Sequence, residues 1–355
     1  MPQPILTNLP VPPPGKTGWP WTEQSDPLPE AQPDGSPWPK ISIVTPSYNQ
    51  GQFIEETIRS ILLQGYPNLE YIVMDGRSDD ETVSILEKYD PWIDYWVSEA
   101  DRGQSHAINK GIDLASGKIF NWINSDDYLA KDALYAVATQ FSNAKNANIV
   151  AGYDLRLQHE NDKVVGKYRI ALSRTPEESV VEHVFTQPPT FFRLDTLHKL
   201  GPLNEKLNFI MDTELFIRYL IRFGQEDIIL SDSVLSYYRL HKNSKTVAQS
   251  KEFRREYRKV LTGLMNILDK KFGYMIDSIG VMSIHTSMSG VNLSDLYGQL
   301  GIKKIEMLTG VSVLKQIICT LKIILHAPRF FIKRWRFIAG AIRKSLLKSN
   351  YNQDV

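Results

Sequence analysis

Short runs of β-branched and aromatic residues alternate with longer amphipathic segments from residue 40 onward. This alternation is typical of βαβ units, in which helices cover a mainly parallel sheet. The helical segments place apolar residues three and four positions apart. The segments expected as strands are Ile41–Thr45, Glu70–Asp75, Asp94–Ser98, Lys118–Asn124, Ile149–Tyr153, Lys163–Arg169 and Ile228–Arg239, and those expected as helices are Gln52–Gln64, Glu81–Lys88, Ser105–Leu114, Lys131–Phe141, Thr213–Phe223 and Lys251–Leu268.

The first 39 residues have a different pattern, because they contain twelve prolines. Proline has no backbone N–H to donate, so this density disfavours both helix and sheet. Its aromatic residues Trp19, Trp21 and Trp38 indicate that part of the segment lies against the folded body, the alternative being an unattached proline-rich leader. The sequence thus divides into a proline-rich arm (1–39), one compact domain (40–250) and a C-terminal helical region (251–355).

Composition narrows the function classes. The 355 residues are 42% hydrophobic and 23% charged, which is typical of a globular chain that buries a substantial core. With 41 basic and 40 acidic residues, no chain-wide attraction to nucleic acid is expected. The single cysteine, Cys319, excludes an internal disulfide and a cysteine-built metal site, which fits a reducing compartment. The N-terminus lacks the basic and apolar pattern of a cleaved signal peptide.

Acidic residues cluster where two of the expected strands end. Asp75 and Asp80 follow one strand, and Asp126 and Asp127 follow another. In an open α/β sheet, ligands bind outside the carboxyl ends of the strands. Two oxygen ligands there can hold Mg²⁺ or Mn²⁺ and leave positions for substrate phosphates. For an isolated turn with two acids, the alternative is an N-cap of the helix expected at Lys131–Phe141.

A third candidate segment is Asp101-Arg-Gly-Gln-Ser-His-Ala-Ile-Asn-Lys-Gly111, a loop that runs into a helix. Its glycine permits close backbone approach, and the N-terminus of the helix offers amide donors. Arg102 or Lys110 can meet phosphate oxygens. Alone the motif is weak, because Asn109 and Lys110 are also ordinary solvent-facing helix residues.

Four segments in this order resemble the motifs of the family 2 glycosyltransferases: Ile41–Asn49, Val73–Asp80, Asp101–Gly111 and Asn124–Asp127. The resemblance runs from about residue 40 to 245 and is most specific in its first half. It implies the GT-A fold, a Rossmann-like mixed and mainly parallel sheet flanked by helices, here with a C-terminal helical extension. It also implies an enzyme that transfers a sugar from a nucleotide-diphosphate sugar to an acceptor, with inversion at the anomeric carbon.

The resemblance also implies individual roles in a donor site. Asp75 matches the carboxylate that binds the base, and Asp126 matches the metal-binding member of the DxD motif, so a divalent cation (Mg²⁺ or Mn²⁺) is the expected cofactor. His241 matches a histidine near the metal or the diphosphate, the alternative being a structural histidine. The residues expected to bind the nucleotide sugar are Pro46, Tyr48, Asn49, Asp75, Asp80, Arg102, Asn109, Lys110, Asn124 and Ser125.

The chain departs from the family pattern at two places. Asn124 replaces the first acid of DxD, which removes a charge but keeps an oxygen that can bind a metal-bound water or ribose, so weaker metal affinity is expected. Arg77 and Glu81 stand where the family usually has glycines. The loop then either pairs Arg77 with a nearby carboxylate or presents it to the donor.

The catalytic base is expected late in the domain. Inversion requires an unprotonated base opposite the leaving diphosphate. Met211–Arg218 resembles the family's late acidic motif, with Asp212 matching the base and Glu214 its neighbour on the acceptor side. The alternative is a helix with acids in its first turn, which the helix dipole favours. Gln187–Arg193 resembles the acceptor-side segment, in which Phe191 either packs against a sugar or belongs to the core.

The end of the chain is basic, with no acid between Glu306 and Asp354. No stretch reaches the ~18 uncharged apolar residues of a spanning helix. Val313–Leu325 and Phe330–Leu347 instead have the composition of interfacial helices attracted to anionic lipid. A helix packed on the catalytic domain or on a dimer partner is the alternative.

These features together predict a cytoplasmic enzyme, peripheral at the inner face of the cell membrane. It is expected to use a UDP- or dTDP-linked sugar and a glycan or lipid-linked acceptor in surface polysaccharide assembly, and to bind no nucleic acid. One alternative is a catalytically weak sugar-nucleotide-binding protein, which Asn124 favours. Another is a nucleotidyltransferase, which would be expected to carry a basic phosphate loop where Ser47–Gly51 stands.

Overall fold

The structure, a computed structural model, describes residues 4–242, 244, 250–271, 289–307 and 313–351. The chain divides into two compact units. The first comprises Met1–Ile170, Val184–Leu215 and Asp227–Ser250, and the second comprises Ala171–His183, Phe216–Glu226 and Lys251–Val355. Every residue expected from the sequence to contact the donor, the metal or the acceptor belongs to the first unit.

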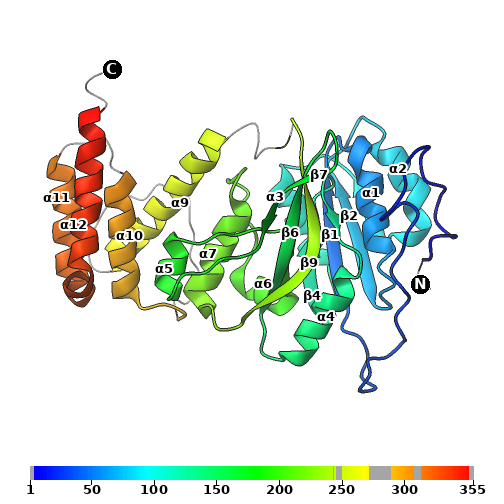
Figure 1. Cartoon of the computed structure of the whole chain (residues 1–355), viewed down its shortest axis with the longest axis horizontal. Helices are drawn as coiled ribbons and strands as arrows, with labels where there is room; N and C mark the ends of the chain where they lie inside the picture. The colour runs from blue at the N-terminus through cyan, green and yellow to red at the C-terminus, as the bar shows by residue number, and fades with distance from the viewer. Residues whose placement is uncertain (1–3, 243, 245–249, 272–288, 308–312, 352–355) are drawn as a thin grey trace. The chain divides into compact units, whose positions relative to one another are not determined.

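Within the described residues, nine strands form one sheet in the first unit (Figure 1). The strand order is β3-β2-β1-β4-β8-β6-β9-β5, and β7 pairs with β6 outside this path. The strands are β1 (Ile41–Ser47), β2 (Leu69–Asp75), β3 (Tyr95–Ser98), β4 (Ile119–Trp122), β5 (Tyr128–Leu129), β6 (Ile149–Gln158), β7 (Lys163–Tyr168), β8 (Thr190–Arg193) and β9 (Ile228–Leu240).

The sheet is mixed. Strand β1 is parallel to β2 and β4, β2 is parallel to β3, and β6 is parallel to β9. Strand β8 runs antiparallel to both of its neighbours, β4 and β6, and the pairs β5–β9 and β6–β7 are also antiparallel. Antiparallel pairs are thus as numerous as parallel ones among the described strands, more than the mainly parallel sheet expected from the sequence.

Helices cover both faces of the sheet. Those of the first unit are α1 (Gly51–Leu62), α2 (Thr82–Tyr89), the short 3₁₀-helix η1 (Asp90–Trp92), α3 (Gln104–Leu114), α4 (Ala133–Asn143) and α6 (Leu194–Leu200). Helix α7 (Met211–Phe223) begins in the first unit and ends in the second. The other helices of the second unit are α5 (Pro176–Val181), α9 (Ser250–Lys271), α10 (Leu293–Met307), α11 (Val313–His326) and α12 (Pro328–Tyr351).

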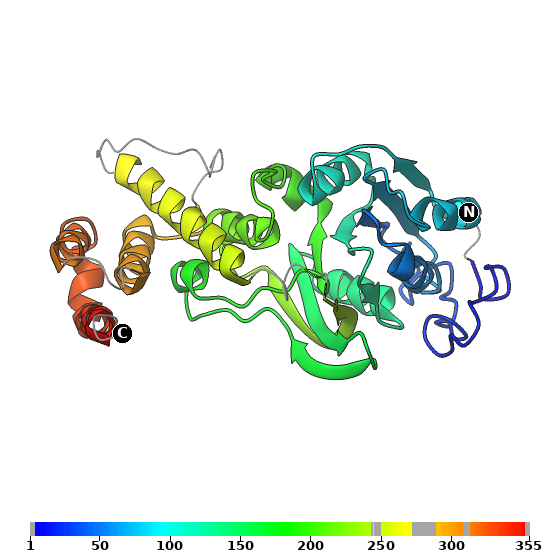
Figure 2. The same ribbon diagram turned by 90° about the horizontal axis from the view of Figure 1, so that it is seen from above.

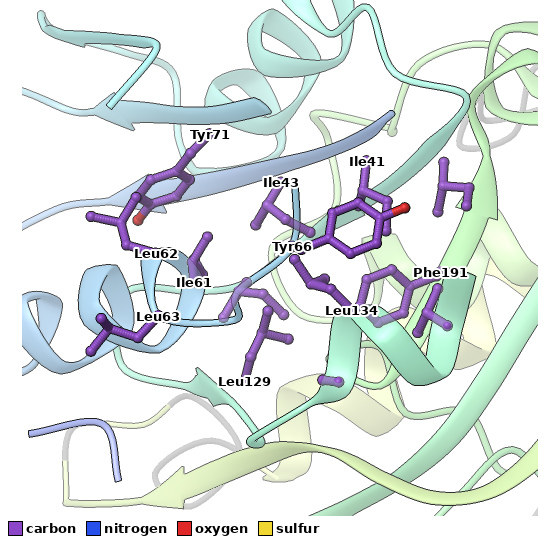
Figure 3. Close-up of a cluster of buried hydrophobic side chains, with 14 of the residues drawn as sticks. Ile41, Ile43, Ile61, Leu62, Leu63, Tyr66, Tyr71, Leu129, Leu134 and Phe191 are labelled. Atoms are coloured by element: carbon purple, nitrogen blue, oxygen red, sulfur yellow. The ribbon is translucent and has the colours of Figure 1, made fainter. Parts of the chain in front are cut away.

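The main hydrophobic core lies between the sheet and helices α1 and α4 (Figure 3). Alternate residues Ile41 and Ile43 of β1 enter this core, as does Ile61 from the apolar face of α1. The opposite face of the sheet carries α3, whose Gly111 lies so close to Val44 that a Cβ atom would be 2.4 Å from a Val44 methyl carbon. Each fully buried aliphatic side chain stabilises the fold by about 1.5–3 kcal/mol, so the strand ends are held on a rigid frame.

The proline-rich arm is packed on the first unit, as its tryptophans predict. Trp21 and Trp38 are only 5% and 4% exposed. The indole of Trp19 donates a hydrogen bond of 2.8 Å to the carbonyl of Leu129 in β5. The arm is therefore part of the folded body.

Arg59 of α1 anchors this arm. Its side chain is completely buried, and its guanidinium donates hydrogen bonds of 2.9–3.1 Å to the carbonyls of Pro10, Pro20 and Trp21. A fourth bond, of 3.0 Å, reaches the hydroxyl of Tyr89. Proline-rich backbone cannot pair in a ladder, so the buried guanidinium supplies the donors that these carbonyls need.

In the second unit, α10, α11 and α12 pack on one another (Figure 2). Gly298 and Gly301 of α10 allow this, because a Cβ at these positions would lie 2.2 Å from Phe330 and 2.5 Å from Ile323. A small apolar cluster that includes Ile323, Phe330 and Ile338 fills the interface. None of the described helices is long and apolar enough to cross a bilayer.

Candidate active site

The loops after β1 and β2 are joined by hydrogen bonds. The backbone N–H of Asn49 donates to Ser78 Oγ (2.8 Å), and Asn49 Oδ1 accepts from the Asp79 N–H (3.0 Å). Asn49 adopts a φ of +52°, a left-handed conformation that asparagine tolerates better than most residues. Asn49, expected to touch the nucleoside, therefore fixes the shape of both loops.

Asp80 joins the same loops through the first turn of α1. Its Oδ2 accepts a 2.7 Å hydrogen bond from the N–H of Gly51, and its Oδ1 accepts one from the N–H of Thr82. Partial burial would raise the pKa of Asp80, but the hydrogen bonds from Thr82 and Gly51 outweigh it and lower the pKa. Asp80 is thus held as an anion that caps α1.

Asp75 lies at the end of β2 and is only 2% exposed. Its carboxylate accepts hydrogen bonds from the Ser78 N–H (2.9 Å), from Ser78 Oγ (2.5 Å) and from Ser98 Oγ (2.6 Å). These hydrogen bonds fix the orientation of the Asp75 carboxylate, and its contact with the base stays a prediction. Ser98, at the end of β3, belongs to the site although no motif indicated it.

Gly76 lies between Asp101 and Tyr48. A Cβ added to Gly76 would be 2.9 Å from Asp101 Oδ2 and 3.3 Å from the Tyr48 ring, whereas the Tyr48 side chain is 64% exposed. We call Tyr48, Asp75, Gly76 and Asp101 the Gly76 cluster. Pro46, in β1, pairs with Met74 and places the loop that carries Tyr48.

Arg77 follows directly and has a φ of +67°. This left-handed conformation costs a non-glycine residue roughly 1 kcal/mol or more, which is the physical reason for a glycine at this position in the family pattern. The side chain is exposed, and within the described part of the chain it forms no ion pair. The expected pairing of Arg77 with a nearby carboxylate, one of its two predicted arrangements, is therefore not found among the described residues.

The loop before α3 is held by Glu205. Arg102 forms a two-pronged ion pair with it, with hydrogen bonds of 2.9 Å from Nε and 3.1 Å from Nη2. Desolvation would raise the pKa of Glu205, but the hydrogen bonds from Arg102 and Asn109 lower it. Gly103, with a φ of +112°, caps α3 and donates its N–H to Asp101 Oδ1 (2.7 Å). Arg102, expected to meet phosphate, is paired with protein in this structure.

Asn109 and Lys110 also bind protein groups. Asn109 exchanges two hydrogen bonds with the backbone of Leu203, of 2.8 and 3.0 Å, and Lys110 forms an ion pair with Glu99. In this structure the amide of Asn109, expected to contact the nucleotide sugar, is bonded to Leu203. It positions the segment between α6 and α7, which leads to Asp212.

Asp126 and His241 meet at the centre of the site. Asp126 Oδ2 lies 3.0 Å from His241 Nε2, which brings the turn after β4 to the end of β9. The histidine ring is buried and packs against Phe53, with ring centroids 4.8 Å apart. The two residues assigned to metal binding from the sequence are thus adjacent.

Asp127 has a different environment from Asp126. Its carboxylate is buried and accepts hydrogen bonds from the Arg239 N–H (3.0 Å) and from Asn124 Nδ2 (3.2 Å). Burial, and after it the charge of Asp126, raise the pKa of Asp127 well above its usual value. Asp127 therefore shapes the turn, whereas the partly exposed Asp126 can reach a ligand.

Asn124 and Ser125 complete the turn. Asn124 Oδ1 accepts a 2.7 Å hydrogen bond from Gln104 Nε2, which joins the turn to α3. Ser125 is 3% exposed, and its carbonyl accepts from Thr57 Oγ1 (3.0 Å). The oxygen that Asn124 was expected to offer to a metal-bound water or ribose is engaged with Gln104, and the side chain of Ser125 is buried.

The residues present fit a divalent cation with two protein ligands. Among the described residues, no three histidine, cysteine or acidic side chains gather as a metal site. Asp126 and His241 nevertheless offer one oxygen and one nitrogen donor at a strand edge. Manganese accepts such a mixed set, and water and diphosphate oxygens can complete its coordination.

Asp212 lies in the first turn of α7 and is half-buried. Its Oδ1 accepts the N–H of Thr213 at 2.7 Å, so the carboxylate also stabilises the start of the helix. Glu214 is only 2% exposed. Both descriptions of Asp212 from the sequence, base and helix cap, are compatible with this placement.

Of the two positions expected for Phe191, on the acceptor side or in the core, the structure has the core. Its ring is fully buried in the main core with Ile41 and Leu134 (Figure 3). Strand β8, which carries Phe191, lies between β4 and β6 in the sheet. Phe191 and Phe192 are both fully buried, so they stabilise the packing of the fold. The sequence had left both possibilities open.

Comparisons with known proteins identify the family that this chain resembles. The family model "Glycosyl transferase family 2" matches residues 42–201. An uncharacterized glycosyltransferase of Rickettsia prowazekii is 28% identical over 249 residues, which are 67% of this chain and 75% of the relative. The GalNAc(5)-diNAcBac-PP-undecaprenol beta-1,3-glucosyltransferase of Campylobacter jejuni is 36% identical over 100 residues, 27% of this chain and 32% of that protein.

Among solved structures, residues 1–349 of S. aureus TarS superpose with a TM-score of 0.57 and 17% identity, covering 89% of this chain and 92% of that one. The same TarS fragment has also been solved with UDP-GlcNAc, and this complex superposes with a TM-score of 0.55. At this identity the likeness concerns the fold, which is GT-A. Residues 42–201 thus match glycosyl transferase family 2, and the chain is a glycosyltransferase.

Proposed function

We propose that this enzyme transfers a sugar, with inversion at the anomeric carbon, from a UDP- or dTDP-sugar to a lipid-linked glycan in surface polysaccharide assembly. The observation that carries the proposal is the Asp126–His241 pair, which lies at the same sheet edge as the Gly76 cluster. The UDP-GlcNAc complex of TarS supports a UDP-linked donor, and the name of the Campylobacter relative supports an undecaprenol-linked acceptor.

The nucleoside would bind at the Gly76 cluster. The exposed ring of Tyr48 can stack on a base, and the missing side chain of Gly76 leaves space beside Asp101. The fixed carboxylate of Asp75 has lone pairs beyond those used by Ser78 and Ser98, so it can accept a hydrogen bond from a base N–H. Uracil and thymine both carry such an N–H at N3, so either base can bind here, and the preference over guanine rests on the UDP-GlcNAc complex of TarS.

The diphosphate would bind next to Asp126 and His241. A cation held by these two residues would neutralise charge that builds on the leaving diphosphate. Arg77 is exposed on the neighbouring loop and can add a positive charge there. Asp126 and His241 themselves orient one another, because the imidazole Nε2 and the carboxylate oxygen are in hydrogen-bond contact.

Asp212 would act as the base. An acceptor hydroxyl oxygen forms the new bond to the anomeric carbon while the bond from that carbon to the diphosphate breaks. The electron pair leaves with the nucleoside diphosphate, and the hydroxyl proton passes to the Asp212 carboxylate. The half-buried position at the start of α7 leaves this carboxylate partly accessible.

Hydrolysis of a panel of UDP-, dTDP- and GDP-sugars by the purified full chain, with and without Mn²⁺, tests the donor assignment. We expect slow release of UDP or dTDP that requires the cation, and none of GDP. Binding of nucleotide without any turnover, with or without acceptor lipids, would support the alternative of a catalytically weak sugar-nucleotide-binding protein.

We also propose a peripheral location on an anionic membrane through α11 and α12. Leu321, Ile324 and Leu325 share one face of α11 and are 57%, 39% and 64% exposed, whereas Cys319 and Ile323 on the other face are buried. Such a face next to basic side chains is typical of helices that lie in a lipid interface.

Helix α12 repeats this arrangement. Ile332 and Trp335 are 71% and 54% exposed. Arg329, Lys333 and Arg336 are exposed on the adjoining stripe of the helix. Each basic residue near an anionic surface contributes about 1 kcal/mol of attraction, so three of them add to the apolar contribution.

A further inference from the structure

Hairpin β6–β7 and strand β9 carry a group of side chains that the donor site does not use. The guanidinium carbon of Arg156 in β6 lies 3.9 Å from the ring centroid of Tyr168 in β7 and 5.3 Å from that of Tyr238 in β9. Gly166 makes this stacking possible, because a Cβ there would lie 2.4 Å from the Tyr168 ring. The Arg156 side chain is 27% exposed, and Tyr168 is 40% exposed.

Three buried polar atoms beside this group have no hydrogen-bond partner in the described chain: Asp154 Oδ2, Arg156 Nε and Ser236 Oγ. The strand register places Asp154 next to Ser236, two residues from the pair of Arg156 and Tyr238. Buried polar atoms without a partner cost about 1–3 kcal/mol each, and in native proteins such atoms often meet water or a ligand.

Asp154 forms an ion pair with Arg156 through one of its two oxygens. Asp154 Oδ2 lies 3.6 Å from Arg156 Nε, too far for a hydrogen bond, and its other oxygen accepts from Thr186 Oγ1 (2.9 Å). Burial raises the pKa of Asp154. The ion pair involves Nε, and no hydrogen bond from the Arg156 Nη groups to another described residue is found, so these groups can serve another anion.

The group faces the side of the sheet that leads to Asp212. In β9, Leu235 enters the core beneath α1 and α4, and Arg239 pairs with Glu56 of α1 at 3.2 Å. Because side chains alternate along a strand, Ser236 and Tyr238 face the opposite side. That side carries α3 and the segment bonded to Asn109 that leads to Asp212.

The order of the strands then separates donor from acceptor. The Gly76 cluster lies at β1, β2 and the loop after β3, whereas Asp126 follows β4 and His241 follows β9, the strand that pairs with β6. Tyr238 precedes His241 by three residues, roughly 10 Å along the strand. Because the acceptor attacks opposite the leaving diphosphate, we place it on the side of the Asp126–His241 pair that is remote from the Gly76 cluster, next to Tyr238 and its partner strand β6.

We propose that Arg156, framed by Tyr168 and Tyr238, binds a carboxylate or phosphate group of an anionic acceptor glycan. The inference rests on the proposed function, because it needs an acceptor on this side. Tyrosine rings pack against the C–H faces of sugars, and a guanidinium held between two rings presents its N–H groups to an oxyanion in a fixed geometry.

Calorimetry on the full chain tests this without the natural acceptor. The probes are hexagalacturonate, which carries carboxylates, a hexamer of glycerol phosphate, which carries phosphodiesters, and neutral maltohexaose. The variants are Arg156→Gln and, as matched control, Lys167→Gln. Lys167 stacks on Tyr153 at 4.1 Å on the other face of the same hairpin, so its loss removes the same type of contact and the same charge.

We expect the protein to bind one anionic probe at least about ten-fold more tightly than maltohexaose, which is ~1.4 kcal/mol. Arg156→Gln should remove this preference and Lys167→Gln should keep it, with UDP affinity equal in all three proteins. Equal binding of neutral and anionic probes, no binding of either anionic probe, or an unchanged Arg156→Gln variant would each overturn the inference. If the unmodified protein does not bind UDP, the proposed donor is refuted instead. The glycan titrations still decide the role of Arg156 in that case.

Discussion

His241 Nε2 lies 3.0 Å from Asp126 Oδ2, although 115 positions separate the two residues in the chain. The two residues meet because β9, which ends just before His241, pairs with β5, the two-residue strand that directly follows the Asp126 turn. Asp126 is the partly exposed member of the acidic pair, and Asp127 is the buried one. Their substitution should therefore have different consequences.

Asp126→Asn should lower sugar transfer at least about 100-fold, because it removes the only anionic donor of the proposed cation site. Stability should change little, since the carboxamide can still bond to His241. Initial rates over a Mn²⁺ titration, with Asp79→Asn as an exposed acidic control, measure this effect. A variant with normal transfer in the presence of a chelator would contradict the assignment.

Gly76→Ala should weaken nucleotide binding about ten-fold or more, because the new methyl group would lie 2.9 Å from Asp101 Oδ2 and 3.3 Å from the Tyr48 ring. Calorimetry with UDP in the absence of metal measures it. Gly340→Ala is a suitable control, since a Cβ at Gly340 meets nothing within 4 Å. Equal UDP affinity of Gly76→Ala and the unmodified protein would move the nucleoside away from this cluster.

Arg59→Met should destabilise the protein by about 3–5 kcal/mol, the usual effect of breaking a buried charged network. The substitution leaves the carbonyls of Pro10, Pro20 and Trp21 without their donor. Arg102→Met breaks an exposed ion pair instead and should cost less than about 1 kcal/mol. Urea unfolding of both variants compares them, and equal midpoints would show that the arm does not contribute to stability.

Leu325→Ser, Ile332→Ser and Trp335→Ser in one protein should greatly reduce binding to vesicles that contain phosphatidylglycerol, because they remove exposed apolar contacts and no core contact. Cosedimentation of the full chain measures binding, which should also weaken as salt screens the attraction. Absence of binding by the unmodified protein would refute the membrane proposal. A change from dimer to monomer on gel filtration would show that these residues contact a second copy.

The sequence predicted the parts of the fold that have a strong local pattern. Strands β1 to β4 and helices α1 to α3 occur within three residues of their expected limits, because each is a run of apolar residues with helical or strand spacing. Strand β5 has only two residues and β8 only four, too short for a period to show. Strand β8 runs antiparallel to β4 and β6. The sequence of a strand does not indicate the direction of its neighbours, so this arrangement could not be predicted.

Sequence motifs predicted the positions of some residues of the candidate site, but not the contacts of residues outside the motifs. Asp75, Asp126 and His241 lie at the sheet edge where their motifs indicate. The pairing of Arg102 with Glu205 was not predictable, because Glu205 belongs to no motif and is brought to α3 only by the folded chain. Phe191 was ambiguous for a related reason, since an aromatic residue in a strand has the same pattern whether it faces a ligand or the core.

Asp212→Asn separates catalysis from binding. Its carboxylate now accepts the N–H of Thr213, and an asparagine side-chain oxygen can accept the same hydrogen bond, so the start of α7 should be preserved. Removal of the ability to take a proton should lower transfer by about 10²–10⁴-fold, which is the usual contribution of a general base.

Donor affinity should stay near that of the unmodified protein, because Asp212 follows the segment held by Asn109 and is not part of the Gly76 cluster. Single-turnover transfer and UDP calorimetry on the same protein measure the two quantities separately. Normal transfer would leave Asp212 as a helix-capping residue and make the buried Glu214 the next candidate for the base. Loss of UDP binding with retained fold would place Asp212 in the donor site, because a base that acts only on the acceptor hydroxyl contributes to the barrier and not to donor affinity.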